Sequence, residues 1–165
     1  MSGKAYNVLF VDVGNAARSI LAEVVMNSEG HGRFRAYSAG CRPQGEVSGQ
    51  AIELARSVGY PVDSLRSKDW LEFAAPEAPE MDLVILLNDV EHDICCPVWP
   101  GRPVTARWHF SDPERATGET ERSVAFHQLF RELAERIHLL HDLPERALDR
   151  MALESHVHSL QTGSS

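Results

Sequence analysis

The sequence predicts an α/β domain, a three-layer sandwich built on a four-stranded parallel sheet. Short apolar runs alternate along the chain with segments of helical periodicity, the order that produces a parallel sheet covered by helices. The run at residues 81–87, MDLVILL, is continuously apolar, as expected for a strand covered on both faces. The chain has 165 residues, enough for one domain with a full core and too few for two comfortable ones.

The first half of the chain predicts two strands and two helices. The apolar run at residues 6–12 is expected to form the first strand, and a helix with an apolar inner face follows at 18–27. A second strand is expected at 34–38, and it stops before a glycine. The second helix begins after Ser48, its expected N-cap, and stops at Gly59.

The second half predicts two further strands and the longest helix. The region between Gly59 and the third strand is punctuated by prolines and predicts irregular structure, with one helical turn near Trp70. The third strand is expected at 81–87 and the fourth at 104–110. The helix is expected at 119–142, because six apolar residues form one stripe at helical spacing: Phe126, Leu129, Phe130, Leu133, Ile137 and Leu140.

The domain is predicted to span residues 1–155 as one unit. Pro144 suits the first turn of a final helix. Residues 156–165 are expected to form a flexible C-terminal tail.

Composition excludes several classes of partner. The net charge is −8 and the isoelectric point about 5.4, which argues against nucleic acid as a partner, since that needs a basic face. No apolar run approaches the roughly 20 residues of a membrane span, and no signal peptide is visible. The cysteines, Cys41, Cys95 and Cys96, form no zinc-binding CxxC pair. We expect a cytoplasmic protein with no metal site; the oligomeric state stays open.

Residues 8–23, VLFVDVGNAARSILAE, are the candidate functional segment. A buried strand runs into Asp12, small residues follow, and Arg18 begins a helix. Loop amides, a helix N-terminus and an arginine aimed at one point are a means of holding an oxyanion. The sequence therefore predicts an oxyanion-binding loop formed by Val13, Gly14, Asn15, Ala16, Ala17, Arg18 and Ser19.

This segment resembles the phosphate loop of the low-molecular-weight protein tyrosine phosphatases and of the arsenate reductases that share their fold. The loop of that family reads C-x-x-N-x-x-R-S, and Asn15, Arg18 and Ser19 match it, followed by Ala22-Glu23.

Four further segments carry the resemblance. AYSAG at 36–40 is similar to the second strand of the family, and DP at 112–113 resembles its general-acid loop. LRSKDW at 65–70 and CPVWPG at 96–101 are similar to the arsenate-reductase branch. The resemblance covers roughly residues 6–150 and implies the low-molecular-weight phosphatase fold.

The resemblance also implies roles for individual residues. Arg18 is expected to bind the oxyanion, Asp112 stands in the position of the general acid, and Cys96 matches a redox cysteine of the arsenate-reductase branch. The implied ligand is a phosphate-like or arsenate-like oxyanion, or a phosphoprotein. No resident cofactor is implied, and thioredoxin or glutaredoxin would serve as a reductant only where arsenate reduction is retained.

The chain departs from the family at the nucleophile. Asp12 stands where the family has its attacking cysteine, and Asn88-Asp89 stand where the arsenate-reductase branch has a further cysteine. The sequence therefore keeps the scaffold, the arginine and the acid, but lacks the attacking thiol and one relay thiol.

Three interpretations of Asp12 are open. Its carboxylate, held ionised by the field of the loop, accepts bonds from the amides of residues 14–18 or pairs with Arg18, and the protein is a non-enzymatic binding or regulatory module. Alternatively, Asp12 is a nucleophile that forms an aspartyl phosphate, with Mg²⁺ at Asp89 or Asp112. In the third interpretation, the chain was changed deliberately at this position from the cysteine of an active enzyme.

Two other phosphate-binding folds share part of the motif. DVGN after an apolar strand is similar to the turn of the acetate-kinase and actin superfamily, but that turn leads into a second strand, whereas here a helix follows. The first motif of haloacid-dehalogenase phosphatases needs a second aspartate where this chain has Gly14. Asn15 is expected to hold the shape of the loop, through a left-handed backbone or through side-chain bonds.

Overall fold

The computed structural model describes residues 5–29, 32–87, 99–100 and 103–143. Within them, four strands form one sheet in the order β2-β1-β3-β4, and every neighbouring pair is parallel. This confirms the predicted α/β fold and its four-stranded parallel sheet. The strands are β1 (Tyr6–Asp12), β2 (Phe34–Gly40), β3 (Leu83–Leu86) and β4 (Val104–Arg107).

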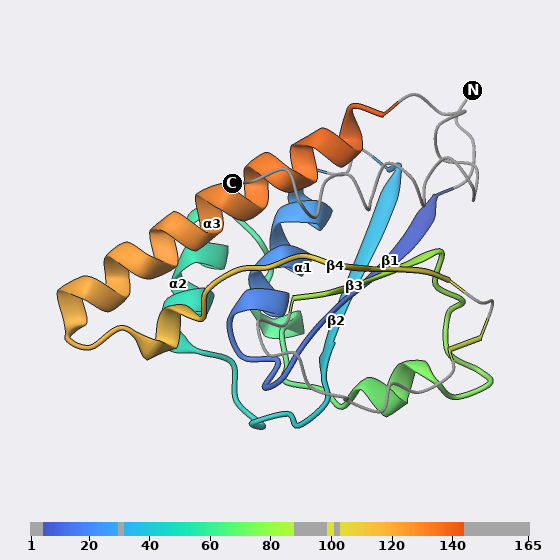
Figure 1. Cartoon of the computed structure of the whole chain (residues 1–165), viewed down its shortest axis with the longest axis horizontal. Coiled ribbons are helices and arrows are strands. Elements are labelled where there is room, and N and C mark those ends of the chain that lie inside the picture. Colours follow the sequence, from blue (N-terminus) through green and yellow to red (C-terminus); the bar gives the residue numbers. More distant parts are fainter. Residues whose placement is uncertain (1–4, 30–31, 88–98, 101–102, 144–165) are drawn as a thin grey trace.

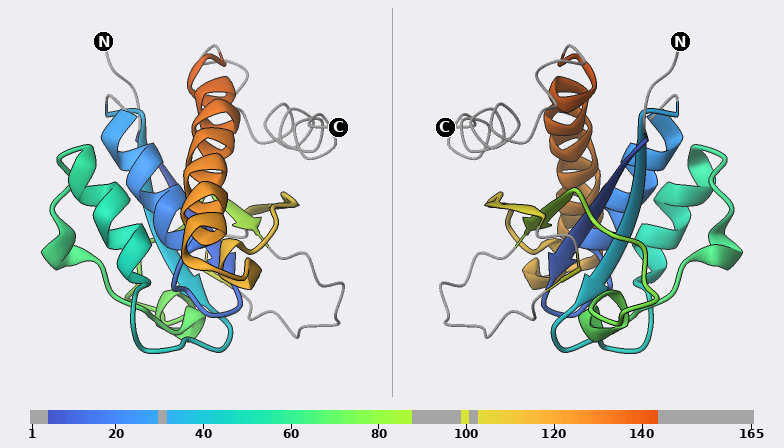
Figure 2. Two further views of the ribbon diagram at one scale, coloured as in Figure 1. Left: turned by 90° about the vertical axis from the view of Figure 1, so that its left-hand side faces the viewer. Right: turned by 90° about the vertical axis from the view of Figure 1, so that its right-hand side faces the viewer.

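Three helices lie together against one face of the sheet (Figures 1 and 2). They are α1 (Arg18–Glu29), α2 (Gly49–Ser57) and α3 (Glu119–His141). Their buried side chains share one apolar core with alternate residues of the strands, such as Val8 and Phe10 of β1. The stripe predicted for the longest helix faces this core, with Phe130 only partly buried.

The opposite face of the sheet has a second, smaller core. Leu9 and Val11 of β1 pack there against Trp70 and Phe73 of the short 3-10 helix η2 (Trp70–Phe73), together with Trp99. The helices, the sheet and this covering segment form three layers. Since β1 is covered on both sides, its apolar run needs no polar alternation.

Some strand ends differ from the sequence prediction. At these positions, pairing with the neighbouring strand determines where the strand ends, and burial does not. The fourth strand ends at Arg107, the partner of Leu86, although Trp108 and Phe110 beyond it are buried. The second strand continues to Gly40, since its pairing with β1 extends to the Asp12–Gly40 pair. The first helix extends to Glu29.

Two predictions lie outside the described residues: the final helix after Pro144 and the tail at 156–165. In the part of the chain that the structure describes, no helix combines the length and apolar character that crossing a bilayer requires.

Candidate functional site

The candidate site lies at the carboxyl end of β1, where residues 12–19 (the 12–19 loop) turn from the sheet into α1. Asp12 is the last residue of β1 and Arg18 the first of α1. Ligands of open parallel sheets sit at this edge, where strand ends and helix N-termini meet. A pocket of about 320 Å³ opens there, lined by Asp12, Val13, Gly14, Ala16, Ala17, Arg18, Arg42, Gln44, Asp112, Glu114 and Arg115.

The Asp12 carboxylate accepts hydrogen bonds from backbone amides of its own loop. Oδ1 accepts a hydrogen bond from the Asn15 amide at 2.7 Å, and Oδ2 accepts one from the Ser19 amide at 3.0 Å. The side chain is buried, with 4% of the residue exposed. Asn15 falls within the predicted donors, residues 14–18, whereas Ser19 lies one residue beyond them.

Burial has the largest effect on the pKa of Asp12. Desolvation raises the pKa of this carboxyl, while the Arg18 charge and the hydrogen bonds from Ser19 and Asn15 lower it in part. The sequence-based expectation that the loop field keeps Asp12 ionised left out this desolvation. The net direction is a pKa above the ordinary aspartate value.

Arg18 is buried at the side of the pocket and is tied to the end of the sheet. Its Nη1 donates to the Phe110 carbonyl oxygen at 3.0 Å, and its Nη2 lies 4.0 Å from Asp112 Oδ2. Asp112 in turn caps the 3-10 helix η3 (Pro113–Arg115), since its Oδ1 accepts the Glu114 amide at 3.0 Å. The structure therefore brings together Asp12, Arg18 and Asp112, the three side chains that the sequence singled out.

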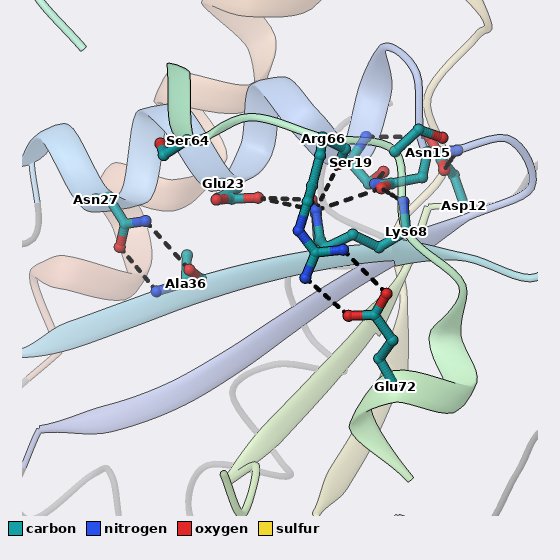
Figure 3. A network of polar contacts seen from close by, with 12 residues as sticks. Asp12, Asn15, Ser19, Glu23, Asn27, Ala36, Ser64, Arg66, Lys68 and Glu72 are labelled. Carbon is teal, nitrogen blue, oxygen red and sulfur yellow. Dashed lines mark hydrogen bonds and ion pairs between the residues drawn. The ribbon is translucent and has the colours of Figure 1, made fainter. Parts of the chain in front are cut away.

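Asn15 has both features predicted for it. Its φ of 49° is in the left-handed region. Its buried carboxamide forms hydrogen bonds through both the nitrogen and the oxygen. Nδ2 donates to Ser19 Oγ at 2.7 Å, and Oδ1 accepts the Lys68 amide at 2.7 Å (Figure 3). Asn15 thus shapes the loop and does not line the pocket.

Lys68 and the pocket rim were not predicted as parts of the site. Lys68 belongs to the segment LRSKDW, residues 65–70 (the 65–70 segment), which the sequence offered only as a family motif. Arg42, Gln44, Glu114 and Arg115 lie in the loop after β2 and in η3, where no periodicity or spacing marks them. Burial, followed by the Asp112 charge, raises the pKa of Glu114.

The redox prediction lies outside the described residues, because Cys96 and the neighbouring Asn88, Asp89 and Cys95 are not among them. Cys41 follows β2, and its amide donates to the Asp12 carbonyl oxygen at 3.1 Å. Desolvation raises the pKa of its thiol.

Comparison with known proteins identifies a matching family. A family model described as low molecular weight phosphotyrosine protein phosphatase matches residues 7–152. The arsenate reductase of Bacillus licheniformis is 31% identical over 132 residues, which make up 79% of this chain and 91% of that protein.

Solved structures show the same fold. An arsenate reductase in the phosphate binding state superposes with a TM-score of 0.67 at 24% identity, covering 82% of this chain and 96% of that one. The arsenate reductase of Archaeoglobus fulgidus gives a TM-score of 0.63 at 25% identity, over 82% of this chain and 99% of the other.

Proposed function

Because this chain belongs to the low molecular weight phosphotyrosine protein phosphatase family, we propose that it carries an oxyanion loop in a self-occupied form. In this form the Asp12 carboxylate takes the place of a bound oxyanion, and thiol-based catalysis does not occur. The observation that carries the proposal is the pair of amide bonds to Asp12, from Asn15 at 2.7 Å and from Ser19 at 3.0 Å.

Self-occupation weakens the binding of an external oxyanion in two ways. The amides of Asn15 and Ser19 already donate to Asp12, so they are not available to an incoming oxygen. An ionised Asp12 also repels an anion: like unit charges about 4 Å apart cost about 4 kcal/mol at an effective dielectric of 20. That energy corresponds to roughly a thousandfold in affinity.

The remaining groups support a scaffold that keeps the arginine and the acid of the phosphatase reaction but lacks the attacking thiol. Arg18 lies beside the pocket, where its guanidinium would bind the oxygens of a tetrahedral anion. Asp112 lines the same pocket, where its carboxyl would protonate a leaving group. A thiol at position 12 would meet the same amides at a helix N-terminus, the environment that lowers a cysteine pKa and makes a nucleophile.

The proposed role of the native chain is that of a binding or regulatory module. The pocket rim has Arg42, Gln44 and Arg115 beside its acidic residues, and these side chains stay available to a phosphoprotein or another anionic partner.

The test compares the native protein with Asp12→Cys and Asp12→Ser in p-nitrophenyl phosphate hydrolysis and thioredoxin-coupled arsenate reduction. We expect no turnover by the native chain above the background of the assay, and phosphatase turnover about a hundredfold or more above that background in Asp12→Cys. Asp12→Ser removes the negative charge without supplying a thiol, so it is expected to bind vanadate without turnover.

Two results would overturn the proposal. One is turnover by the native protein that is abolished in Asp12→Asn, which would make Asp12 a nucleophile. The other is tight vanadate binding by the native protein, with a dissociation constant below about 100 μM.

A further inference from the structure

A buried ammonium group contacts Asn15 of the 12–19 loop and does not line the pocket. Lys68 is 7% exposed, and its Nζ faces oxygen atoms from three parts of the chain. It lies 2.7 Å from the Arg66 carbonyl oxygen, 3.2 Å from Ser38 Oγ and 3.4 Å from Asn15 Oδ1 (Figure 3). The three ammonium protons thus each have an acceptor.

The charge of this ammonium is balanced within the same cluster. Glu23 Oε1, from α1, lies 3.9 Å from Lys68 Nζ, and the Ser38 hydroxyl donates to this carboxylate oxygen at 2.6 Å. Burial lowers the pKa of Lys68 and raises that of Glu23, and the opposite charge of each partner offsets part of the effect. Removing one partner of such a pair leaves the other charge buried and unpaired, which is costly.

Asn15 connects this cluster to position 12. Its Oδ1 is held twice by Lys68, by the backbone amide at 2.7 Å and by Nζ at 3.4 Å. Its Nδ2 donates to Ser19 Oγ, and the backbone amides of Asn15 and Ser19 are the two donors to Asp12. The carboxamide therefore connects the ammonium to both of these donor residues.

We propose that Lys68 is a positioning residue of the 12–19 loop, whose ammonium fixes the Asn15 carboxamide and thereby aims the Asn15 and Ser19 amides at position 12. Lys68 does not line the pocket, and its side chain contacts the loop at Asn15. The role extends beyond self-occupation by Asp12, since the same amides would face any group at that position.

The chain supplies a matched control for the charge of Lys68. Arg66 is in the same 65–70 segment, but 62% of its side chain is exposed, and it forms a two-point ion pair with Glu72 at 2.8 and 3.0 Å. Arg66→Gln removes a positive charge close to Lys68 without removing a side-chain contact to Asn15.

The experiment follows the Asp12 carboxyl by carbon-13 NMR and the Asn15 amide by proton NMR during one pH titration. The Asp12 signal is identified by its loss in Asp12→Asn. In the native protein and in Arg66→Gln, we expect the chemical shift of the Asn15 amide proton to change as Asp12 is protonated. In Lys68→Met we expect this coupling to be lost, the pKa of Asp12 to rise, and the Asn15 amide to exchange with solvent about tenfold faster.

A purely electrostatic role for Lys68 would overturn the proposal. It would raise the pKa of Asp12 in Lys68→Met but leave the Asn15 amide protected and still coupled to Asp12. These readouts do not depend on turnover, so their failure is distinct from that of the proposed function.

If Lys68→Met does not fold, the native protein provides the decisive measurement. Lys4 is the only other lysine in the sequence, so selective labelling gives simple lysine spectra. We expect one ammonium to exchange slowly with water and its deprotonation to shift the Asn15 carboxamide signal. Ordinary fast exchange at both lysines, with no response from Asn15, would contradict the proposal.

Discussion

The Asp12 carboxylate lies at the carboxyl end of β1, next to the pocket. The sequence alone predicted that Asp12 accepts bonds from the loop amides or pairs with Arg18, and the Asn15 amide does donate to it. It did not identify Ser19 as the second donor, because the direction of that amide depends on how the loop turns into α1. It also missed the desolvation of Asp12 by burial.

The ionisation of Asp12 predicts a pH-dependent affinity for an oxyanion. Because burial raises the pKa of this carboxyl, it takes up its proton at a higher pH than a free aspartate does. Below that pKa the like charge is gone and the carboxyl is a weaker acceptor for the loop amides. We expect sulfate to bind more tightly as the pH falls from neutral toward the acid limit of the folded state, as measured by calorimetry.

Two variants separate this effect from other titrating groups. Asp12→Asn should show little pH dependence in sulfate affinity. Glu114→Gln, which removes a carboxyl from the pocket rim, should keep the dependence of the native protein. A sulfate affinity that is flat with pH in the native protein would show that the charge of Asp12 does not control access to the loop.

At the scale of elements, apolar periodicity located every described strand and α-helix, but it did not determine where strands end. An apolar run reports burial, whereas a strand stops where its partner stops, as β4 does at Arg107. The 65–70 segment has no periodicity, so its contacts with the 12–19 loop could not be predicted from the sequence. Its backbone nevertheless pairs with the end of β2, where the Gly40 amide donates to the Lys68 carbonyl oxygen at 2.8 Å.

The close approach of β2 to the loop predicts a strict requirement for glycine at position 40. A Cβ on Gly40 would lie 2.6 Å from the Val13 carbonyl oxygen and 2.9 Å from the Asn15 amide nitrogen. Both atoms belong to the backbone, so the loop would have to shift. We expect Gly40→Ala to lower the free energy of unfolding by about 1–3 kcal/mol in urea titrations.

Gly49→Ala is the matched control, because a Cβ at this first position of α2 meets nothing within 4 Å. Its free energy of unfolding should stay the same or rise by up to about 1 kcal/mol, since alanine favours the helix. Equal effects of the two substitutions would mean that the loop and β2 are not in tight contact.

At the scale of the whole molecule, the alternation of strands and helices indicated a parallel sheet with its site at the carboxyl ends of the strands. The strand order β2-β1-β3-β4 did not follow from it, because alternation leaves the order of neighbours open. Nor did the sequence show that α1, α2 and α3 share one face, which depends on where each connection crosses the sheet. The single domain at 1–155 remains a prediction.

The shared core predicts that the sheet and its helical layer unfold together. Leu133 of α3 is fully buried in that core, so Leu133→Ala should lower the free energy of unfolding by about 2–5 kcal/mol. Tryptophan fluorescence and far-ultraviolet circular dichroism should give one coincident transition in both proteins.

Val124→Ala is the control on the same helix, since Val124 is 60% exposed, and its effect should stay within about 0.5 kcal/mol. Separate transitions for the two probes would contradict a single cooperative domain.

Asn15, Gly40 and the 65–70 segment hold the backbone around position 12 through contacts that do not involve the side chain at that position. This bears on how a family member exchanges thiol and carboxylate in evolution. No single-nucleotide change converts an aspartate codon into a cysteine codon, and the intermediate codons specify glycine or tyrosine. A tyrosine ring is far larger than the buried carboxylate, so the stepwise route runs through glycine, in a protein whose oxyanion site is open and has no nucleophile.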